Sequence, residues 1–372
     1  MVTKNQEKEL IIGKTKVGGK NPCFIVAEIG INFNGKYENA INLIDAAAKA
    51  GCNAVKFQLF KAKKMYTEKA GDYFRTNSKK ENIFRLVKKA ELPENWIPKL
   101  KKHANSNGLE FFSTACDEES ADVLEKNNIS AYKIASYEIT HVPLLKHIAK
   151  KGKPIIFSSA GATIKEIKDA LKILKEEKNN EIVLMHCIGK YPTPLKDLNL
   201  NVIDDLRKRF PEVIIGYSDH SLDPIAAPRA AVGLGAKVIE KHITLDRNLS
   251  GNDNYCAIEP KELSLMVKVI RKTEEEIKKG RKIEINPLVL GSSERKIYKG
   301  EDYIRNFTYR CVFAIKEIKR GELFAKDNIA VLRPGNIERG LEPKYYELLI
   351  NECRALKNIK KGESIKKEHY EK

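Results

Sequence analysis

Short apolar runs rich in β-branched residues alternate with amphipathic stretches along most of the chain. Such runs predict buried strands, and the apolar spacing of three and four between them predicts helices. Eight strands are expected, at residues 23–30, 53–60, 109–116, 131–136, 154–161, 181–189, 213–219 and 237–244. Eight strand–helix units in roughly 250 residues are typical of a (β/α)8 TIM barrel of the α/β class. An open doubly wound sheet usually has fewer strands.

The periodic pattern breaks after Gly280, and a second unit follows. We expect a barrel domain with an N-terminal hairpin over residues 1–282, a linker over 283–308 and a small domain over 309–372. The small domain contains an internal repeat, IKRGELFAKDNI and IKKGESIKKEHY. A unit of this size rarely builds an independent core, so it should lean on the barrel or on another subunit.

Charge and cysteine content restrict the class of protein. The formal net charge is +18, but basic and acidic residues alternate, as in KEIKDALKILKEEKNNE. A nucleic-acid surface would gather its basic residues on one patch, so we expect no nucleic-acid partner. No apolar run approaches the ~18 residues of a membrane span, and the N-terminus has no signal-peptide core. The seven cysteines are scattered without a CxxC pair, which favours free thiols in a cytoplasmic protein with no membrane partner.

The C-terminal ends of the predicted strands all carry polar residues. In a TIM barrel these ends hold the functional side chains. In chain order they are Glu28; Lys56 and Gln58; Ser113 and Thr114; Lys133, Ser136 and Glu138; Ser158 and Ser159; Tyr191; Ser218, Asp219 and His220; Glu240 and His242.

Two of these residues, His220 and His242, end adjacent predicted strands. Two imidazoles can share a divalent metal and leave positions open for water and substrate. Lys56, Lys133 and the hydroxyls suit a compact anion bearing phosphate or carboxylate. Each residue also has a structural interpretation, since a single strand-end histidine is often only hydrogen-bonded and serine or threonine often caps a helix. The set as a whole indicates a site for a phosphorylated acid and a metal.

Several motifs carry a resemblance to a known family. They are AEIGIN, VKFQ, STACDEES, YKIAS, IIFSSAG, HCIGKYPTP, IGYSDHS, IEKHITLD and LRPGN. In order and layout the chain resembles the sialic acid (nonulosonate) synthases, which have a TIM barrel followed by an antifreeze-like (SAF) domain. The resemblance implies condensation of phosphoenolpyruvate with an N-acetylated amino sugar, releasing phosphate. It also implies a divalent metal, Mn2+ first with Mg2+ or Co2+ as alternatives, and a homodimer with a swapped C-terminal domain.

The family's site residues can be carried over position by position. The resemblance implies metal ligands at His220 and His242, and phosphoenolpyruvate contacts at Lys56, Thr114, Lys133, Ser136, Ser158, Tyr191 and Ser218. It places Glu28, Gln58, Glu138 and Asp253 near the sugar, and Arg333 on the N-acetyl group in the partner's barrel. Glu28 or Glu138 would handle the proton of the attacking water.

Three positions differ from the usual family pattern. Phe33 replaces a common histidine, Gly189 replaces a common polar residue, and LSGND stands where PGPD is usual. We expect all three to flank the sugar side of the site. The acceptor therefore stays open among N-acetylmannosamine, its 6-phosphate and 6-deoxy diacetamido sugars.

Two other functions compete with the synthase. A barrel lysine such as Lys133 could form an imine in a Schiff-base aldolase, which requires a lysine of lowered pKa. The basic surface and the small domain could instead belong to a glycan- or polyanion-binding protein without catalysis.

Overall fold

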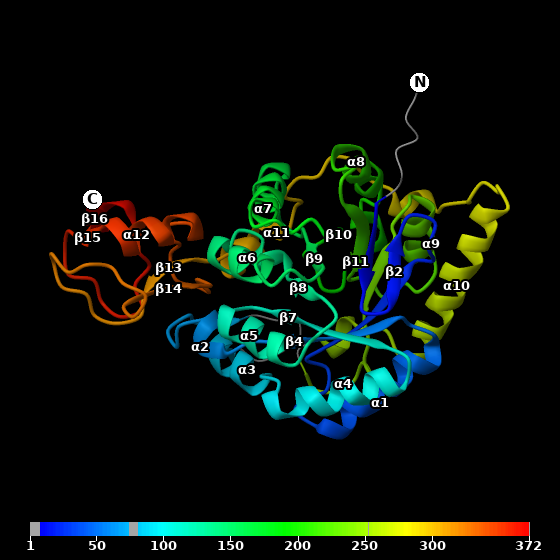
Figure 1. The fold of residues 1–372 in the computed structure, drawn as a ribbon, viewed down its shortest axis with the longest axis horizontal. Helices are drawn as coiled ribbons and strands as arrows, with labels where there is room; N and C mark the ends of the chain where they lie inside the picture. Colours follow the sequence, from blue (N-terminus) through cyan, green and yellow to red (C-terminus); the bar gives the residue numbers. More distant parts are fainter. Residues whose placement is uncertain (1–7, 74–80, 252, 372) are drawn as a thin grey trace.

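Eight parallel strands close into a barrel in the computed structural model, which describes residues 8–73, 81–251 and 253–371. Neighbouring strands follow chain order around the barrel, and the last pairs with the first. The TIM barrel predicted from the sequence is therefore confirmed (Figure 1). The strands are β3 (Phe24–Gly30), β4 (Ala54–Leu59), β7 (Glu110–Ala115), β8 (Tyr132–Ile134), β9 (Ile155–Ser158), β10 (Ile182–Cys187), β11 (Ile214–Asp219) and β12 (Val238–His242).

A helix follows each strand and covers the outside of the barrel. In α1, for example, Leu43, Ile44 and Ala47 lie on one buried face, and Gly51 ends the helix in the left-handed region (φ 85°). The helices are α1 (Tyr37–Ala50), α4 (Ile97–Ser106), α5 (Glu118–Lys126), α6 (Val142–Ala149), α7 (Ile164–Glu176), α8 (Asn201–Arg209), α9 (Ala226–Gly233) and α10 (Pro260–Lys278). The connection from β4 to α4 also holds α2 (Ala62–Met65), β5 (Asp72–Tyr73), β6 (Glu81–Asn82) and α3 (Ile83–Lys89).

An N-terminal hairpin closes one end of the barrel. Strands β1 (Glu9–Ile12) and β2 (Thr15–Gly18) pair antiparallel. Their side chains Leu10, Ile12 and Val17 join an apolar cluster with residues of the barrel interior. The C-terminal ends of the strands remain as the end where a site can form.

The chain continues through α11 (Glu301–Thr308) into a small domain. Its elements are β13 (Cys311–Ala314), β14 (Ile329–Leu332), α12 (Tyr346–Glu352), β15 (Arg354–Ala355) and β16 (Tyr370–Glu371). The two halves of the sequence repeat pair through equivalent positions, because Ile318 and Ile359 exchange two backbone hydrogen bonds of 2.9 Å.

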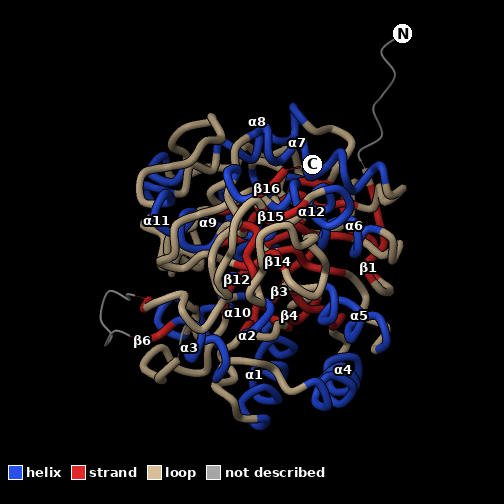
Figure 2. Tube along the Cα trace, turned by 90° about the vertical axis from the view of Figure 1, so that its left-hand side faces the viewer, coloured by secondary structure: helices blue, strands red, loops and turns tan. Residues whose placement is uncertain are grey.

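The small domain docks against the C-terminal end of the barrel. Seen from its own side, β14, β15, β16 and α12 lie in front of the barrel (Figure 2). The backbone N–H of Arg333 donates to Met65 O (2.7 Å), and that of Asn336 donates to Ala70 O (2.8 Å). Within the described residues, no helix is long and apolar enough to cross a membrane.

Candidate active site

Charged side chains from several strands meet inside the barrel at its C-terminal end. Lys56 Nζ lies 2.7 Å from Glu28 Oε2 and 3.7 Å from Glu240 Oε1. Lys133 Nζ and Ser218 Oγ donate to the same Glu240 oxygen, at 3.0 and 3.2 Å. All five residues are almost wholly buried. Buried charges are tolerated where each has a partner of opposite charge, and here the lysines and the carboxylates are one another's partners.

Strand register explains the convergence. Glu28 of β3 lies opposite Lys56 of β4 on one side and opposite His242 of β12 on the other. Ser218 of β11 lies opposite Glu240 of β12. Residues in register on parallel strands point to the same side of the sheet, so these side chains share the barrel interior.

The two carboxylates of the cluster have opposite acidities. Burial raises the pKa of Glu28 to about 7, with the charge of Glu240 adding to the rise and Lys56 opposing it. Burial by itself would also raise the pKa of Glu240, but the positive charges of Lys133 and Lys56 outweigh it and lower the pKa to about 2. Gln58 Nε2 donates to Glu28 Oε1 (2.7 Å). Burial and the charge of Lys56 lower the pKa of Lys133, although Glu240 opposes this.

The predicted hydroxyl groups lie at or just after the C-terminal ends of β7, β8 and β9. Thr114 Oγ1 accepts from Lys56 Nζ (3.0 Å), and Ser136 Oγ accepts from the backbone N–H of Ala160 (3.0 Å). Ser158 Oγ is buried and has no hydrogen-bond partner among the described residues. Buried hydroxyls are normally satisfied, so an unpaired one at this position suits a bound ligand or water.

The two predicted metal histidines lie side by side. Their ring centroids are 5.6 Å apart, and both side chains are buried. His220 Nδ1 lies 2.7 Å from Ile188 O. Because a carbonyl can only accept, Nδ1 carries the hydrogen and Nε2 keeps its lone pair. His242 Nδ1 is buried without a partner among the described residues, and burial with the charges of His220 and Lys56 lowers its pKa well below the usual value.

In their neutral forms these imidazoles fit a divalent metal as ligands, since only the unprotonated nitrogen can coordinate. Burial lowers the pKa of His220, but Cys187 and the Ile188 carbonyl outweigh it and raise the pKa above its usual value, so a metal would compete with a proton at this ring. The described part of the chain contains no cluster of three or more His, Cys, Asp or Glu side chains arranged to hold a metal. Two protein ligands would leave the other positions to water and substrate. The metal itself stays a prediction.

Tyr191 and Asp253 belong to the same end of the barrel. The Tyr191 ring stacks on His220 with centroids 4.0 Å apart. Burial is the main reason that the pKa of Tyr191 is raised, and the nearby charge of Asp253 adds to it. Asp253 directly precedes the short turn Asn254–Cys256.

The small domain reaches the site through Glu138. This fully buried carboxylate accepts from Arg310 Nε and Nη2 and from Arg333 Nη2, the last at 2.6 Å. Burial opposes ionisation of Glu138, but the two guanidinium groups outweigh it and lower the pKa to about 2. Arg333 Nε is buried and has no hydrogen-bond partner within the described residues. Arg333, expected over the partner's barrel, here contacts the barrel of its own chain.

Arg310 fixes the entry to the small domain. It is fully buried and donates to three backbone carbonyls, those of Lys64 (2.7 Å), Cys116 (2.6 Å) and Val331 (2.9 Å). It thereby joins the ends of α2 and β7 to strand β14. Sequence reasoning missed this residue, because no local pattern marks contacts with segments that are far away in the sequence.

Sequence reasoning also gave no role to Glu240. The signal was present, since Glu240 stands two residues before His242 and so faces the same side of β12. The structure shows that it is the carboxylate shared by both lysines.

Phe33, one of the three positions that differ from the family pattern, does not lie at the site. Phe33 is fully buried and packs against Phe57 (ring centroids 6.3 Å) and Trp96 (6.0 Å) in the core outside the barrel strands. The expectation that it flanks the sugar was therefore wrong, because Phe57 alternates with the inward-facing Lys56 and points outward. At Gly189 a Cβ would meet Ile304 at 3.3 Å, so α11 occupies the space of the missing side chain.

A TIM barrel followed by a small C-terminal domain is the layout that the resemblance to the sialic acid synthases predicts. The chain belongs to the NeuB family: the NeuB family model matches residues 43–282, and the SAF domain model matches residues 309–371.

Three relatives illustrate the membership. The chain is 49% identical to the spore coat polysaccharide biosynthesis protein SpsE of Bacillus subtilis, over 94% of this chain and 93% of that protein. The SpsE crystal structure superposes with a TM-score of 0.88 at 46% identity, covering 97% of this chain and 99% of that one. N,N'-diacetyllegionaminic acid synthase of Campylobacter jejuni is 37% identical over 92% of this chain and 98% of its own length.

The third relative is the N-acetylneuraminic acid synthetase of Leptospira borgpetersenii, crystallised in complex with citrate. It is 35% identical, with a TM-score of 0.67, covering 76% of this chain and 93% of that one.

Proposed function

We propose that this protein condenses phosphoenolpyruvate with an N-acetylated amino sugar, giving a sialic-acid-type nonulosonate and phosphate. The observation that carries the proposal is the pair Lys56 and Lys133, buried around one carboxylate oxygen. The buried, unpaired hydroxyl of Ser158 at the end of β9 adds to it. The names of the relatives, a diacetyllegionaminic acid synthase and an N-acetylneuraminic acid synthetase, support the reaction class. The citrate held by the latter protein supports a site suited to carboxylates.

The lysines would bind the phosphate and carboxylate of phosphoenolpyruvate. Glu240 Oε1, which already lies between Lys56, Lys133 and Ser218, illustrates how the site holds a carboxylate oxygen. Fixed positive charges in a buried pocket stabilise negative charge strongly, because water does not screen them.

The reaction forms one carbon–carbon bond and releases phosphate. The methylene carbon of phosphoenolpyruvate bonds to the aldehyde carbon of the open-chain sugar, whose oxygen gains a proton and becomes a hydroxyl. Water adds to the former enol carbon and loses a proton, which leaves a hydroxyl on that carbon. The bond from this carbon to the phosphate oxygen then breaks as the hydroxyl gives up its proton, so a ketone and inorganic phosphate form.

We assign the proton of the attacking water to Glu28. A group with a pKa of about 7 can accept and return a proton near neutral pH. Glu138 is unsuited to this task, because two arginines occupy its oxygens and lower its pKa to about 2. We propose instead that Glu138 orients Arg333, whose unpaired Nε would meet the N-acetyl carbonyl of the sugar.

The imidazoles of His220 and His242 are the proposed metal ligands. A divalent ion held there, Mn2+ first with Mg2+ or Co2+ as alternatives, would supply Lewis-acid activation of a carbonyl oxygen. Titration calorimetry with MnCl2 on EDTA-treated protein tests this without an activity assay. We expect binding in the native protein and in the control His147→Ala, and its loss in His220→Ala. Equal binding in all three would overturn the assignment.

The central experiment is phosphate release from phosphoenolpyruvate against a panel of acceptors. The panel contains N-acetylmannosamine, its 6-phosphate and a 6-deoxy diacetamido sugar. We expect release with one of them, lost in Lys56→Met and retained in the exposed control Lys268→Met. No release with any acceptor, together with saturable glycan binding, would favour the non-catalytic alternative.

One observation keeps the aldolase as a second candidate. The pKa of Lys133 is lowered, as imine formation requires, although Glu240 is paired with the amine. Borohydride reduction in the presence of pyruvate separates the two reactions. The synthase predicts no adduct on Lys133, whereas a reduced adduct found there by mass spectrometry would establish the imine.

We propose a cytoplasmic homodimer whose small domains are exchanged between subunits, as the family resemblance implies. The contact of Arg333 with Glu138 can form within one chain, as in this structure, or between the chains of such a dimer.

A further inference from the structure

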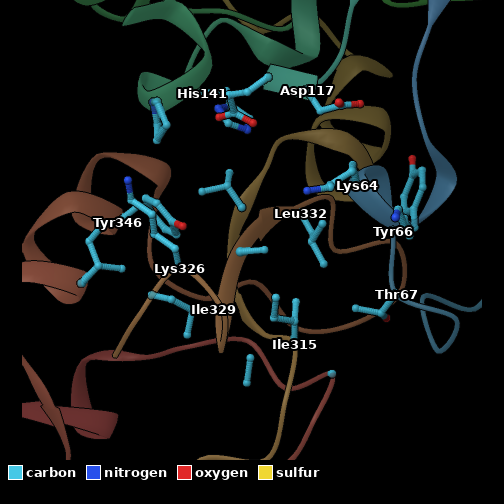
Figure 3. Close-up of a pocket in the computed structure, with 18 of the residues that line it drawn as sticks. Lys64, Tyr66, Thr67, Asp117, His141, Ile315, Lys326, Ile329, Leu332 and Tyr346 are labelled. Carbon is cyan, nitrogen blue, oxygen red and sulfur yellow. The ribbon is translucent and has the colours of Figure 1, made fainter. Parts of the chain in front are cut away.

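A groove of about 960 Å3 separates the small domain from the barrel (Figure 3). Helices α2, α5 and α6 contribute to one wall, and strands β13 and β14 with helix α12 form the other. Its lining includes neither the lysines nor the histidines of the active site. The volume is at the upper end of the range for small-molecule sites, about 300–1,000 Å3.

Much of the groove surface is apolar or aromatic. Ile315, Ile329 and Leu332 line the side of the small domain, and Tyr66 and Tyr346 stand on either flank (Figure 3). Such a surface favours a ligand with an apolar or aromatic body.

The polar groups of the groove are mainly donors. Thr67 Oγ1 is buried without a hydrogen-bond partner among the described residues. His141 Nδ1 accepts from the backbone N–H of Leu144 (3.0 Å), so Nε2 carries the hydrogen and can donate it. Burial and the charge of Arg310 lower the pKa of His141 to about 4, which keeps this ring neutral at pH 7.

The charge of the lining favours an anion. Seven lysines and four carboxylates line the groove. Three of the lysines are paired with carboxylates, Lys64 with Glu119, Lys146 with Glu347 and Lys150 with Glu177. Two of the carboxylates already have partners, since Asp117 accepts from Ser120 and Glu347 from Lys146 (2.7 Å). Lys326 makes no ion pair within the described residues.

We propose that this groove is a second ligand site, for an organic anion with an apolar or aromatic body of about the size of a nucleoside monophosphate. The phosphate or carboxylate would meet Lys326 and His141, and the body would lie on the apolar face of β13 and β14.

The groove adjoins the residues that place Arg333 at the active site. Tyr66 lines the groove and also lies 5.8 Å below the guanidinium of Arg333. The backbone N–H of His141 donates to Glu138 O (2.9 Å). A ligand in the groove therefore touches the residues that hold the Arg333–Glu138 contact and bridges the small domain to the barrel.

Fluorescence titration with 8-anilinonaphthalene-1-sulfonate, an aromatic anion, tests the site on the full-length protein. We expect saturable binding that AMP displaces and that inorganic phosphate at the same concentration does not. Lys326→Glu should weaken binding about tenfold, the effect of losing one charge-assisted contact. Tyr346→Ala should weaken it independently, and the control Lys268→Glu, on α10, should leave it unchanged. Thermal unfolding of each variant checks that the fold is retained.

Unsaturable binding, or equal binding in Lys326→Glu and the control, would overturn the proposal. If phosphate displaced the probe as effectively as AMP, the groove would bind anions without recognising an apolar or aromatic body, and the proposal would also be overturned. The titration contains neither phosphoenolpyruvate nor sugar, so its failure would leave the proposed synthase activity untouched.

Discussion

At the scale of the residue, Glu28 and Glu240 are two carboxylates that pair with the same lysine but differ in pKa. Both lie within 4 Å of Lys56 Nζ, but Glu240 has a second ammonium group in Lys133. The second positive charge keeps Glu240 ionised, while Glu28 is left to exchange its proton near pH 7. Separated pKa values of this kind distinguish a proton-transfer group from a permanent anion.

Glu28→Gln should lower kcat/KM for phosphate release by about 10²–10⁴-fold, the usual contribution of a general base. A base must be deprotonated to act, so kcat/KM of the native protein should fall as the pH drops below about 7. The variant should lose this acid limb, whereas Glu119→Gln, which removes an exposed carboxylate, should keep it. An acid limb that persists in Glu28→Gln would show that another group takes the proton.

At the scale of the element, the pair of strands β13 and β14 is held to the barrel by buried charge. Arg310, just before β13, and Arg333, just after β14, both bind Glu138, which lies in the turn after β8. The small domain has only a small core of its own. The buried ion pairs, together with the backbone hydrogen bonds of Arg333 and Asn336, join it to the barrel.

Arg310→Ala should loosen this docking. Removing one partner of a buried ion pair typically costs about 3–5 kcal/mol, because the remaining charge stays buried. Hydrogen–deuterium exchange should rise at β14 and α2, whose backbone carbonyls Arg310 binds. The control Arg320→Ala, at an exposed turn of the same domain, should not change it. Unaltered exchange in both variants would contradict an anchoring role.

Glu138 should make the docking sensitive to acid. Its pKa is lowered from 4.5 to about 2 in the folded protein, so its ion pairs stabilise the fold above pH 4.5. This stability, about 3 kcal/mol, should be lost as the pH falls from about 4.5 towards 2. Urea unfolding between pH 5 and 3 measures it. Glu138→Gln should be less stable at pH 7 and less dependent on pH, and Glu119→Gln should follow the native protein. Parallel curves for all three would count against the ion pairs.

At the scale of the whole molecule, the small domain completes the mouth of a barrel. The β1–β2 hairpin closes the other end, and α11 crosses the mouth, where Glu301 Oε1 accepts from the backbone N–H groups of Gly161 (2.9 Å) and Gly189 (2.8 Å). In the proposed reaction this cover would exclude water from the reacting aldehyde. In an exchanged dimer each barrel would receive this cover from its partner.

Mixing two inactive variants tests the exchange. Each parent dimer, Arg333→Ala or His220→Ala, lacks a complete site. If the domains are exchanged, a mixed dimer holds one intact barrel covered by an intact Arg333, so phosphate release should recover after subunit exchange. Mixing Arg333→Ala with Glu138→Ala, which damages the same contact from the barrel side, should recover activity in the same way. Absence of recovery despite mixed dimers seen by native mass spectrometry would show that Arg333 acts within its own chain.

The sequence by itself determined the barrel and most of the residues at its mouth. Strand periodicity is local, and the alternation of side chains fixes which residues face inward, so Lys56, Lys133, Ser218, His220 and His242 could be placed together. Only the tertiary structure decided the contacts made across the barrel. That Glu240 is shared by two lysines, that Arg310 meets Glu138 and that Phe33 lies in the outer core depend on packing between distant segments. The hydrophobic periodicity of a segment depends only on its own residues. It would be the same whichever distant segment packed against it, so it cannot predict these contacts.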